Sequence, residues 1–202
     1  MSNKRKTPII NISLLLKYVY SFVQSKTGFK KFGRGSIIKF PYRIWNKKNI
    51  EIGKNVFIVE NSFFAVSTTF KKQKFSPRVV IGNNVSIGSN FFLGCIDGIT
   101  IEDNVIISDR VFIADHTHSY ENPNVPIIDQ PLEPEGKALI KSGSFIGVNA
   151  VIMPGVTIGK NSVVGASSVV TRSVPDYAIV AGAPAKVIKR YDFKTGKWKV
   201  VK

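Results

Sequence analysis

The chain has 202 residues, of which 44% are hydrophobic and 21% charged, a composition typical of one globular domain with a modest appendage. The one cysteine, Cys95, excludes an internal disulfide framework, and no apolar stretch reaches the roughly 20 residues that span a bilayer. Lys and Arg outnumber Asp and Glu by 29 to 13, and the resulting net charge of +16 attracts nucleic acid, anionic lipid or phosphorylated small molecules.

Residues 1–49 form the first predicted segment, which is basic and contains a helix. Asn11 or Ser13 would cap this helix, which runs to about residue 25 with apolar residues at helical spacing. One interpretation is that the helix covers the open end of the following domain. The other is an amphipathic, basic element that rests on an anionic membrane. Because Lys17 interrupts the apolar run and no small-residue cleavage site follows, we expect a cytoplasmic protein without a signal peptide.

Residues 50–175 carry a six-residue repeat that is clearest between residues 140 and 170. An aliphatic residue occupies every sixth position there, and a small or β-branched residue follows four positions after each of the first five. A period of six fits neither an α-helix nor a two-residue alternation, and it predicts a solenoid of short strands and tight turns. We expect both kinds of residue to face inward, and the glycines that follow several aliphatic residues to permit the turn conformation. The aliphatic positions are Ile140, Ile146, Ile152, Ile158, Val164 and Val170.

The repeat starts at Ile52 and is interrupted three times. Longer excursions are expected at about 61–78 and 116–139, and the phase slips by two residues around Asp97 and Gly98. Residues 176–202 form a last segment that ends in a polar, basic tail.

The segment IGVNAVIMPGVTIGKNSVVGASSVVTRSVPDYAIVAGAPAKVIKRY, residues 146–191, closely resembles the hexapeptide-repeat acyltransferases. The similarity extends over roughly residues 50–190 and is greatest to the sugar and polysaccharide O-acetyltransferases, which include the maltose and galactoside acetyltransferases. The resemblance implies an all-β, left-handed parallel β-helix with three repeats per triangular coil. It also implies a homotrimer with active sites between subunits. The first 50 residues lack the acid-rich helical segment of maltose acetyltransferases, which favours the capsule, O-antigen or exopolysaccharide branch.

Two histidines, His116 and His118, stand where the second excursion begins. Acyl transfer to a sugar hydroxyl needs a base that titrates near neutral pH, and histidine meets this need. The resemblance implies that His116 is this general base, and we interpret His118 as a loop-orienting or acceptor-side residue. Since successive side chains of an extended segment diverge, we do not expect Asp115 to orient His116, and we group it with the acceptor-side residues.

Asp97, at the phase slip, has two interpretations. In similar acetyltransferases an acidic residue at such an insertion contacts the acceptor sugar, whereas Asp97–Gly98 is also a common turn sequence. Cys95 is interpreted as a core or cleft residue, because no base is placed to activate its thiol.

The resemblance implies acetyl-CoA as cosubstrate, with no metal. Backbone groups near Val148 and Ala166 would contact the pantetheine arm, Thr171 and Arg172 the adenine nucleotide, and Lys186 and Lys189 the phosphates. Lysine and arginine suit this role because they form charge-assisted bonds with phosphate oxygens.

The expected activity is therefore transfer of an acetyl group from acetyl-CoA to a saccharide acceptor. One acceptor that fits the positive charge is a lipid-linked glycan at the inner face of the membrane. The alternatives are N-acetylation of a nucleotide-linked amino sugar and a non-enzymatic basic solenoid that binds a polyanion. A carbonic anhydrase of the same fold needs three histidines on zinc, and this chain has two. No nucleic-acid-binding motif accompanies the positive charge.

Overall fold

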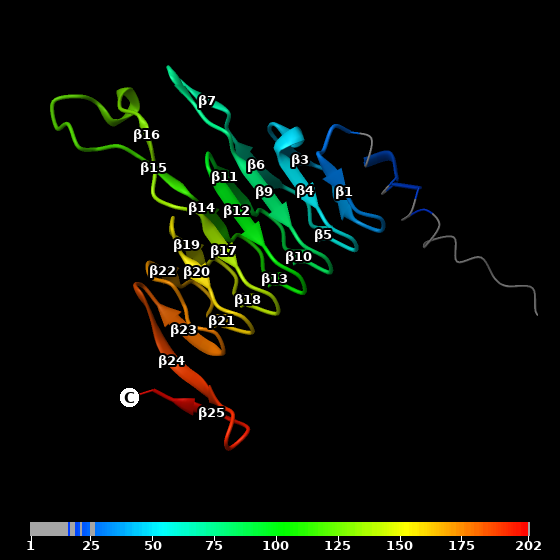
Figure 1. The fold of residues 1–202 in the computed structure, drawn as a ribbon, viewed down its shortest axis with the longest axis vertical. Coiled ribbons are helices and arrows are strands. Elements are labelled where there is room, and N and C mark those ends of the chain that lie inside the picture. The colour runs from blue at the N-terminus through cyan, green and yellow to red at the C-terminus, as the bar shows by residue number, and fades with distance from the viewer. Residues whose placement is uncertain (1–15, 17–18, 21, 25–26, 202) are drawn as a thin grey trace, which may run out of the picture.

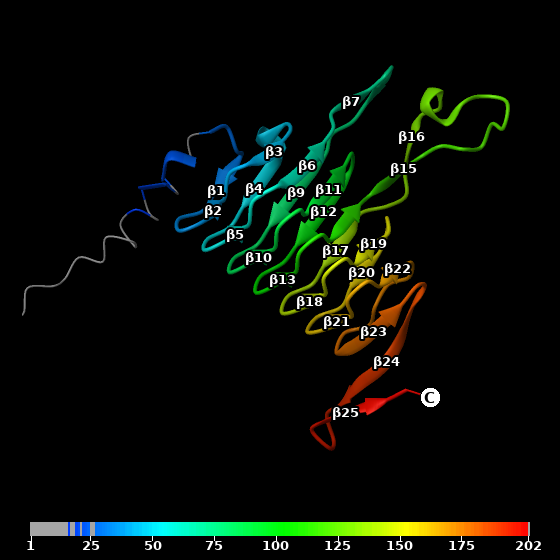
Figure 2. The same cartoon turned by 180° about the vertical axis from the view of Figure 1, so that it is seen from behind.

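The computed structural model of the chain describes residues 16, 19–20, 22–24 and 27–201, and its strands form a left-handed parallel β-helix (Figures 1 and 2). Each coil contributes one short strand to each of three parallel sheets. The first sheet contains β1 (Lys31–Phe32), β4 (Ile50–Ile52), β9 (Arg78–Ile81), β12 (Gly98–Ile101), β17 (Ala138–Ile140) and β20 (Thr157–Ile158). A solenoid is what the six-residue period predicted, and its left-handed, three-sided form is what the family resemblance implied.

The second and third sheets follow the same order. The second contains β2 (Ile37–Ile38), β5 (Phe57–Ile58), β10 (Ser86–Ile87), β13 (Ile106–Ile107), β18 (Phe145–Ile146), β21 (Val163–Val164), β23 (Ala178–Gly182), β24 (Ala185–Asp192) and β25 (Lys197–Val200). The third contains β3 (Tyr42–Ile44), β6 (Ser62–Val66), β11 (Phe92–Cys95), β14 (Phe112–Ala114), β19 (Val151–Ile152) and β22 (Val169–Val170). At the C-terminal end β23, β24 and β25 pair antiparallel.

Three hexapeptides close one coil. In the clean repeats the paired residues Leu139 and Thr157 are 18 positions apart, as are Phe145 and Val163. Earlier coils are longer where the chain makes insertions, and Phe92 pairs with Phe112, 20 positions later. Because the extra residues leave the coil at a corner, the strands above and below keep their register.

The β-helix begins earlier than residue 50. Strands β1, β2 and β3 already form a coil, and β1 pairs with β4 through Lys31 and Glu51. Phe32, Ile38 and Ile44 share the six-residue spacing, and they pack against or belong to the core. A repeat with an aromatic residue at an inward position is harder to recognise from sequence, so the first coil lies within the segment that we expected to precede the solenoid.

The two excursions are also shorter than expected. Phe64 continues the spacing of Ile52 and Ile58, so β6 belongs to the coil and the first excursion spans residues 67–77. It contains the hairpin of β7 (Thr69–Phe70) and β8 (Gln73–Lys74). The second contains β15 (His116–His118) and β16 (Leu132–Pro134), and β17 resumes the coil at Ala138. Short 3-10 helices lie at η1 (Lys47–Asn49) and η2 (Ile127–Asp129).

Most of the predicted N-terminal helix lies outside the described residues, and the described residues between 16 and 24 are helical. The buried Gln24 side chain both donates to the Ile38 carbonyl (2.7 Å) and accepts from the Ile38 N–H (2.9 Å). Ile38 belongs to β2, the edge strand of the second sheet, and this contact is what a segment covering the open end would make. None of the helical segments in the described part of the chain has the length and apolarity to span a lipid bilayer.

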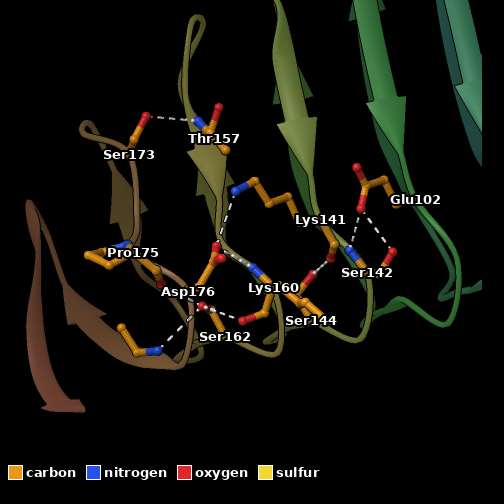
Figure 3. A network of polar contacts seen from close by, with 11 residues as sticks. Glu102, Lys141, Ser142, Ser144, Thr157, Lys160, Ser162, Ser173, Pro175 and Asp176 are labelled. Carbon is orange, nitrogen blue, oxygen red and sulfur yellow. Dashed lines mark hydrogen bonds and ion pairs between the residues drawn. The ribbon is translucent and has the colours of Figure 1, made fainter. Parts of the chain in front are cut away.

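The six aliphatic repeat positions and the small residues four positions later all face the core, with exposed fractions of 3% or less. The hydroxyl groups of the buried serines among them form hydrogen bonds with backbone groups at the corners of the coils. Ser144 donates to the Lys141 carbonyl (2.6 Å) and Ser162 donates to the Pro175 carbonyl (2.7 Å), as Figure 3 shows. Side chains also join successive coils at this corner, since the Ser142 N–H and hydroxyl both donate to Glu102.

The glycines after the aliphatic residues have a different role from the one expected. Gly147, Gly159 and Gly165 do not adopt positive φ, and the left-handed positions at the turns are taken by residues such as Asn149 and Asn161. Instead, a Cβ on Gly147 would lie 2.6 Å from the Ala166 nitrogen in the next coil. These glycines are therefore required by the close approach of successive coils.

We predict that Gly147→Ala destabilises the fold, because the added methyl group would push two coils apart. The free energy of unfolding, measured by urea titration, should fall by about 1–3 kcal/mol. Lys160→Ala, at an exposed corner, is the control and should change it by about 0.5 kcal/mol or less. Equal stability of Gly147→Ala and the unmodified protein would show that the coils can separate without cost.

Candidate active site

His116 and Asp115 form a close pair where the chain leaves β14 for β15. Asp115 Oδ1 lies 2.8 Å from His116 Nδ1, and the Asp115 side chain is fully buried. This corrects the expectation that neighbouring side chains would diverge. Asp115 is a bend residue between two strands, so the backbone is not extended there and both side chains point to the same side. It also corrects the acceptor-side interpretation, because a fully buried carboxylate cannot contact an acceptor.

The phase slip at residues 96–98 builds the binding site for the Asp115 carboxylate. Backbone N–H groups of Ile96 (3.0 Å), Asp97 (2.9 Å) and Gly98 (2.8 Å) donate to its two oxygens. Burial by itself would raise the pKa of Asp115, but the hydrogen bonds from His116 and from this backbone outweigh it and hold the pKa below its ordinary value. Asp115 is therefore a carboxylate at neutral pH.

The Asp115 contact orients the His116 ring. A carboxylate that accepts from Nδ1 fixes the proton on that nitrogen, so Nε2 carries the lone pair that can accept a proton. The His116 side chain is 18% exposed, which leaves the ring within reach of solvent and substrate. This is the arrangement that a histidine general base requires.

His116 lies in a pocket of about 440 Å³ on the outer face of the third sheet, lined by Phe92, Gly94, Phe112, Ala114, His116, Thr117, His118, Met153 and Pro154. A Cβ on Gly94 would lie 3.3 Å from His116 Cε1, so glycine at this position leaves room for the imidazole ring. The pocket is apolar apart from the groups at its edge.

His118 lines the same pocket, and its ring makes an edge contact with Phe70 of the first excursion (5.5 Å between centroids). The Asp97 side chain is 42% exposed and lies 3.7 Å from Lys137, while its backbone contributes to the Asp115 site. Asp97 is a bend residue and Gly98 begins β12, and a contact of Asp97 with an acceptor stays a prediction.

The two excursions contact each other, as their projection from the same edge of the β-helix suggests (Figures 1 and 2). The Gln73 side chain pairs with Leu132 as a strand would, donating to its carbonyl (2.9 Å) and accepting from its N–H (2.8 Å). Lys71 donates to the Ile128 carbonyl and pairs with Asp129. Sequence reasoning missed Gln73 because nothing in the local pattern indicates a contact 59 residues away.

The residues predicted to bind the coenzyme lie at two edges of the third sheet. Thr171 and Arg172 directly follow β22, which pairs with β19, and they lie at the edge that carries His116. Val148 and Ala166 follow β18 and β21 at the opposite edge, where Lys186 lies across from Ala181. Lys189 pairs with Ile179 further along β24. Arg172, Lys186 and Lys189 are exposed.

Cys95 is buried in the core, and desolvation together with the nearby Asp115 charge raises the pKa of its thiol strongly. A neutral, buried thiol is a poor nucleophile. Within the described residues, no three His, Cys, Asp or Glu side chains converge in a group that could hold a metal ion.

Comparison with known proteins identifies the repeats. Residues 137–172 match the family of bacterial transferase hexapeptides (six repeats), and residues 78–113 match the hexapeptide repeat of succinyl-transferase. Two separate segments of the chain are therefore similar to hexapeptide-repeat transferases. This agrees with the resemblance found in the sequence and with the three-sided coil.

Similar proteins include both O- and N-acyltransferases. The chain is 39% identical over 83 residues to Escherichia coli K12 WbbJ, whose name assigns it to lipopolysaccharide O-acetyl transfer, covering 41% of this chain and 42% of WbbJ. It is 50% identical over 52 residues to an Aneurinibacillus thermoaerophilus dTDP-3-amino-3,6-dideoxy-alpha-D-galactopyranose 3-N-acetyltransferase, covering 26% of this chain and 27% of the relative. These matched segments span less than half the length of either relative.

Several solved structures are similar over most of the chain. AntD, an N-acyltransferase from Bacillus cereus in complex with dTDP and 3-hydroxybutyryl-CoA, superposes with a TM-score of 0.73 at 26% identity. The likeness covers 89% of this chain and 92% of AntD.

We predict that Asp115 makes stability depend on pH. Its folded pKa lies below the ordinary value, so its contribution is fully present above about pH 4 and is lost as the pH falls through the folded pKa. In Asp115→Asn, the free energy of unfolding at pH 7 should drop by at least about 2 kcal/mol, because the amide cannot accept all of the hydrogen bonds. Urea titrations between pH 3 and pH 7 should also show a smaller acid-induced loss of stability than in the unmodified protein.

The matched control is Asp97→Asn, which removes an exposed carboxylate from the same turn and should preserve the acid-induced loss. An Asp115→Asn protein with unchanged stability and unchanged pH dependence would contradict the account of the buried carboxylate.

We predict that Gln73→Ala loosens the second excursion, because it removes both hydrogen bonds to the Leu132 backbone. Hydrogen–deuterium exchange should become faster in residues 116–134 and stay unchanged in the coils. Lys72→Ala, at the neighbouring exposed position of the hairpin turn, is the control and should leave the exchange as it is. Unaltered exchange in Gln73→Ala would mean that the two excursions are held in place independently.

Proposed function

We propose that the protein is an acetyltransferase that moves an acetyl group from acetyl-CoA to a sugar hydroxyl, with His116 as general base. The observation that carries the proposal is the His116 ring, which a buried carboxylate contacts at 2.8 Å and which lines a pocket. The aspartate fixes the tautomer and stabilises the charged ring during proton transfer.

In this mechanism His116 Nε2 removes the proton from the acceptor hydroxyl as the acceptor oxygen forms a bond to the thioester carbonyl carbon. The carbon–sulfur bond then breaks, and the imidazolium returns the proton to the leaving thiolate. The Asp115 carboxylate stays ionised throughout, because three backbone N–H groups hold it. The reaction needs no covalent enzyme intermediate, which fits a buried and neutral Cys95.

The exposed cations support coenzyme binding. Arg172 lies at the edge that carries His116, and Lys186 lies at the opposite edge near Ala166. Both supply positive charge for phosphate groups. Their distribution over two edges is what a site shared between neighbouring copies of the chain would give, and we therefore propose a homotrimer.

We place the acceptor in capsule, O-antigen or exopolysaccharide biosynthesis, supported by the similarity to WbbJ. The excess of positive charge would favour contact with an anionic membrane and a lipid-linked glycan at its cytoplasmic face.

The second candidate function is N-acylation of a nucleotide-linked amino sugar. Two observations favour it: the likeness to AntD, whose complex contains dTDP, and the similarity to a dTDP-sugar N-acetyltransferase. The same base would accept a proton from the attacking amine, so His116 serves either reaction. Product analysis by mass spectrometry on a panel of hydroxyl sugars and nucleotide-linked amino sugars separates the two.

We predict that His116→Ala lowers kcat by about 100- to 10,000-fold, the usual range for a general base, and leaves the Kd for coenzyme A unchanged. Turnover is measured by release of free coenzyme A, and binding by calorimetry. His118→Ala is the matched control, with a smaller effect expected because its ring packs on Phe70 and does not pair with Asp115. Near-normal turnover in His116→Ala would eliminate the proposed base.

A further inference from the structure

A row of aromatic side chains runs along the outer face of the third sheet. Phe63, Phe92 and Phe112 are register partners in β6, β11 and β14, one in each successive coil. Their ring centroids are 5.4 Å and 5.1 Å apart, and Trp45 extends the row at 5.0 Å from Phe63. We call these four residues the aromatic row.

The row begins at the candidate active site. Phe92 and Phe112 line the pocket that contains His116, and the row then follows the axis of the β-helix toward its N-terminal end. Since successive strands are spaced by about 4.8 Å, the step from Phe112 to the coil of Trp45 is on the order of 15 Å. A ligand that follows the row is therefore longer than one that fills the pocket alone.

The far end of the row combines an aromatic surface with hydroxyl groups. Trp45 is 47% exposed and borders a depression of about 360 Å³ that is also lined by Asn46, Ser67, Thr68 and Thr69. The side-chain hydroxyls of Ser67, Thr68 and Thr69 make no hydrogen bond to any described residue of the chain. They are available to a ligand.

This combination suits a carbohydrate. The C–H face of a pyranose ring packs on an aromatic side chain, and its hydroxyls at the rim can bond to serine and threonine. An acyl chain or an apolar protein surface would cover the same hydroxyls without offering them partners, which is unfavourable. The continuity of the row with the His116 pocket indicates that such a ligand and the acceptor are one molecule.

We propose that the aromatic row is an extended acceptor subsite, which binds the inner sugar units of an oligosaccharide while one unit is presented to His116. The proposal rests on the proposed function and narrows it to acceptors of several sugar units, because a single sugar unit at His116 would not reach Trp45. Trp45 is then a specificity-determining residue for acceptor length.

The test uses the two tryptophans of the chain, Trp45 and Trp198. Trp198 lies in β25 at the opposite end of the molecule, so the Trp198→Phe protein reports on Trp45 through its fluorescence. The probes are defined oligosaccharides of one to six units, from neutral and acidic sugars. We expect saturable changes in Trp45 emission with the longer oligomers and none with monosaccharides.

A kinetic comparison follows with an accepted oligomer series. Trp45→Ala should raise KM at least tenfold for the longest acceptor, and leave KM for the shortest acceptor and kcat unchanged. Trp198→Ala is the matched control, with the same substitution at a half-exposed position, and should alter neither value.

The outcomes separate the two proposals. Length-dependent binding at Trp45 without any acyl transfer would support the subsite and contradict the proposed activity. Acyl transfer whose KM does not depend on acceptor length, or emission that no oligomer changes, would overturn the subsite. A change of oligomeric state in Trp45→Ala, measured by light scattering, would also overturn it and identify the aromatic row as a contact between subunits.

Discussion

The stacking of one coil directly on the next is the constraint on which the rest of the structure depends. Parallel strands in register leave about 4.8 Å between coils, so inward positions accept only residues that fill the core and some corner positions accept no side chain at all. Gly147 shows the limit, since even one methyl group would meet the Ala166 backbone. Because every coil repeats this geometry, residues far apart in sequence come to lie in straight rows along the axis.

Those rows explain how the candidate site is assembled. The phase slip at residues 96–98 and the excursion after Asp115 occur at the same corner in adjacent coils, so three backbone N–H groups of one meet the carboxylate of the other. An ionised carboxylate buried in this way holds the neighbouring imidazole without a long side-chain network. The regular coils therefore form a rigid frame, and the irregular corner positions the Asp115–His116 pair.

On the outer surface of the β-helix, side chains from successive coils are also aligned along the axis. A row of aromatic residues extends the pocket along the axis, and the paired excursions stand at the same edge through Gln73 and Leu132. The charge of +16 is compatible with a phosphorylated cosubstrate and with an anionic surface, and by itself it does not choose between them. Under the proposed function, the shape of this edge, where side chains from several coils converge, would select the acceptor.

The sequence by itself determined the repeat and the solenoid from residue spacing, and the family resemblance of its motifs implied the three-sided coil and pointed to His116 as the candidate base. It also contained the first coil, at Phe32, Ile38 and Ile44, although the aromatic Phe32 and the lack of a glycine after Ile38 and Ile44 obscured it. Only the tertiary structure decided the role of Asp115, the purpose of the slip at Asp97–Gly98, the pairing of Gln73 with Leu132 and the positions of the coenzyme candidates at two edges. These contacts join different coils or the two excursions. They depend on the direction in which the inserted residues leave each corner of the coil. A local pattern in the sequence carries no information about that geometry.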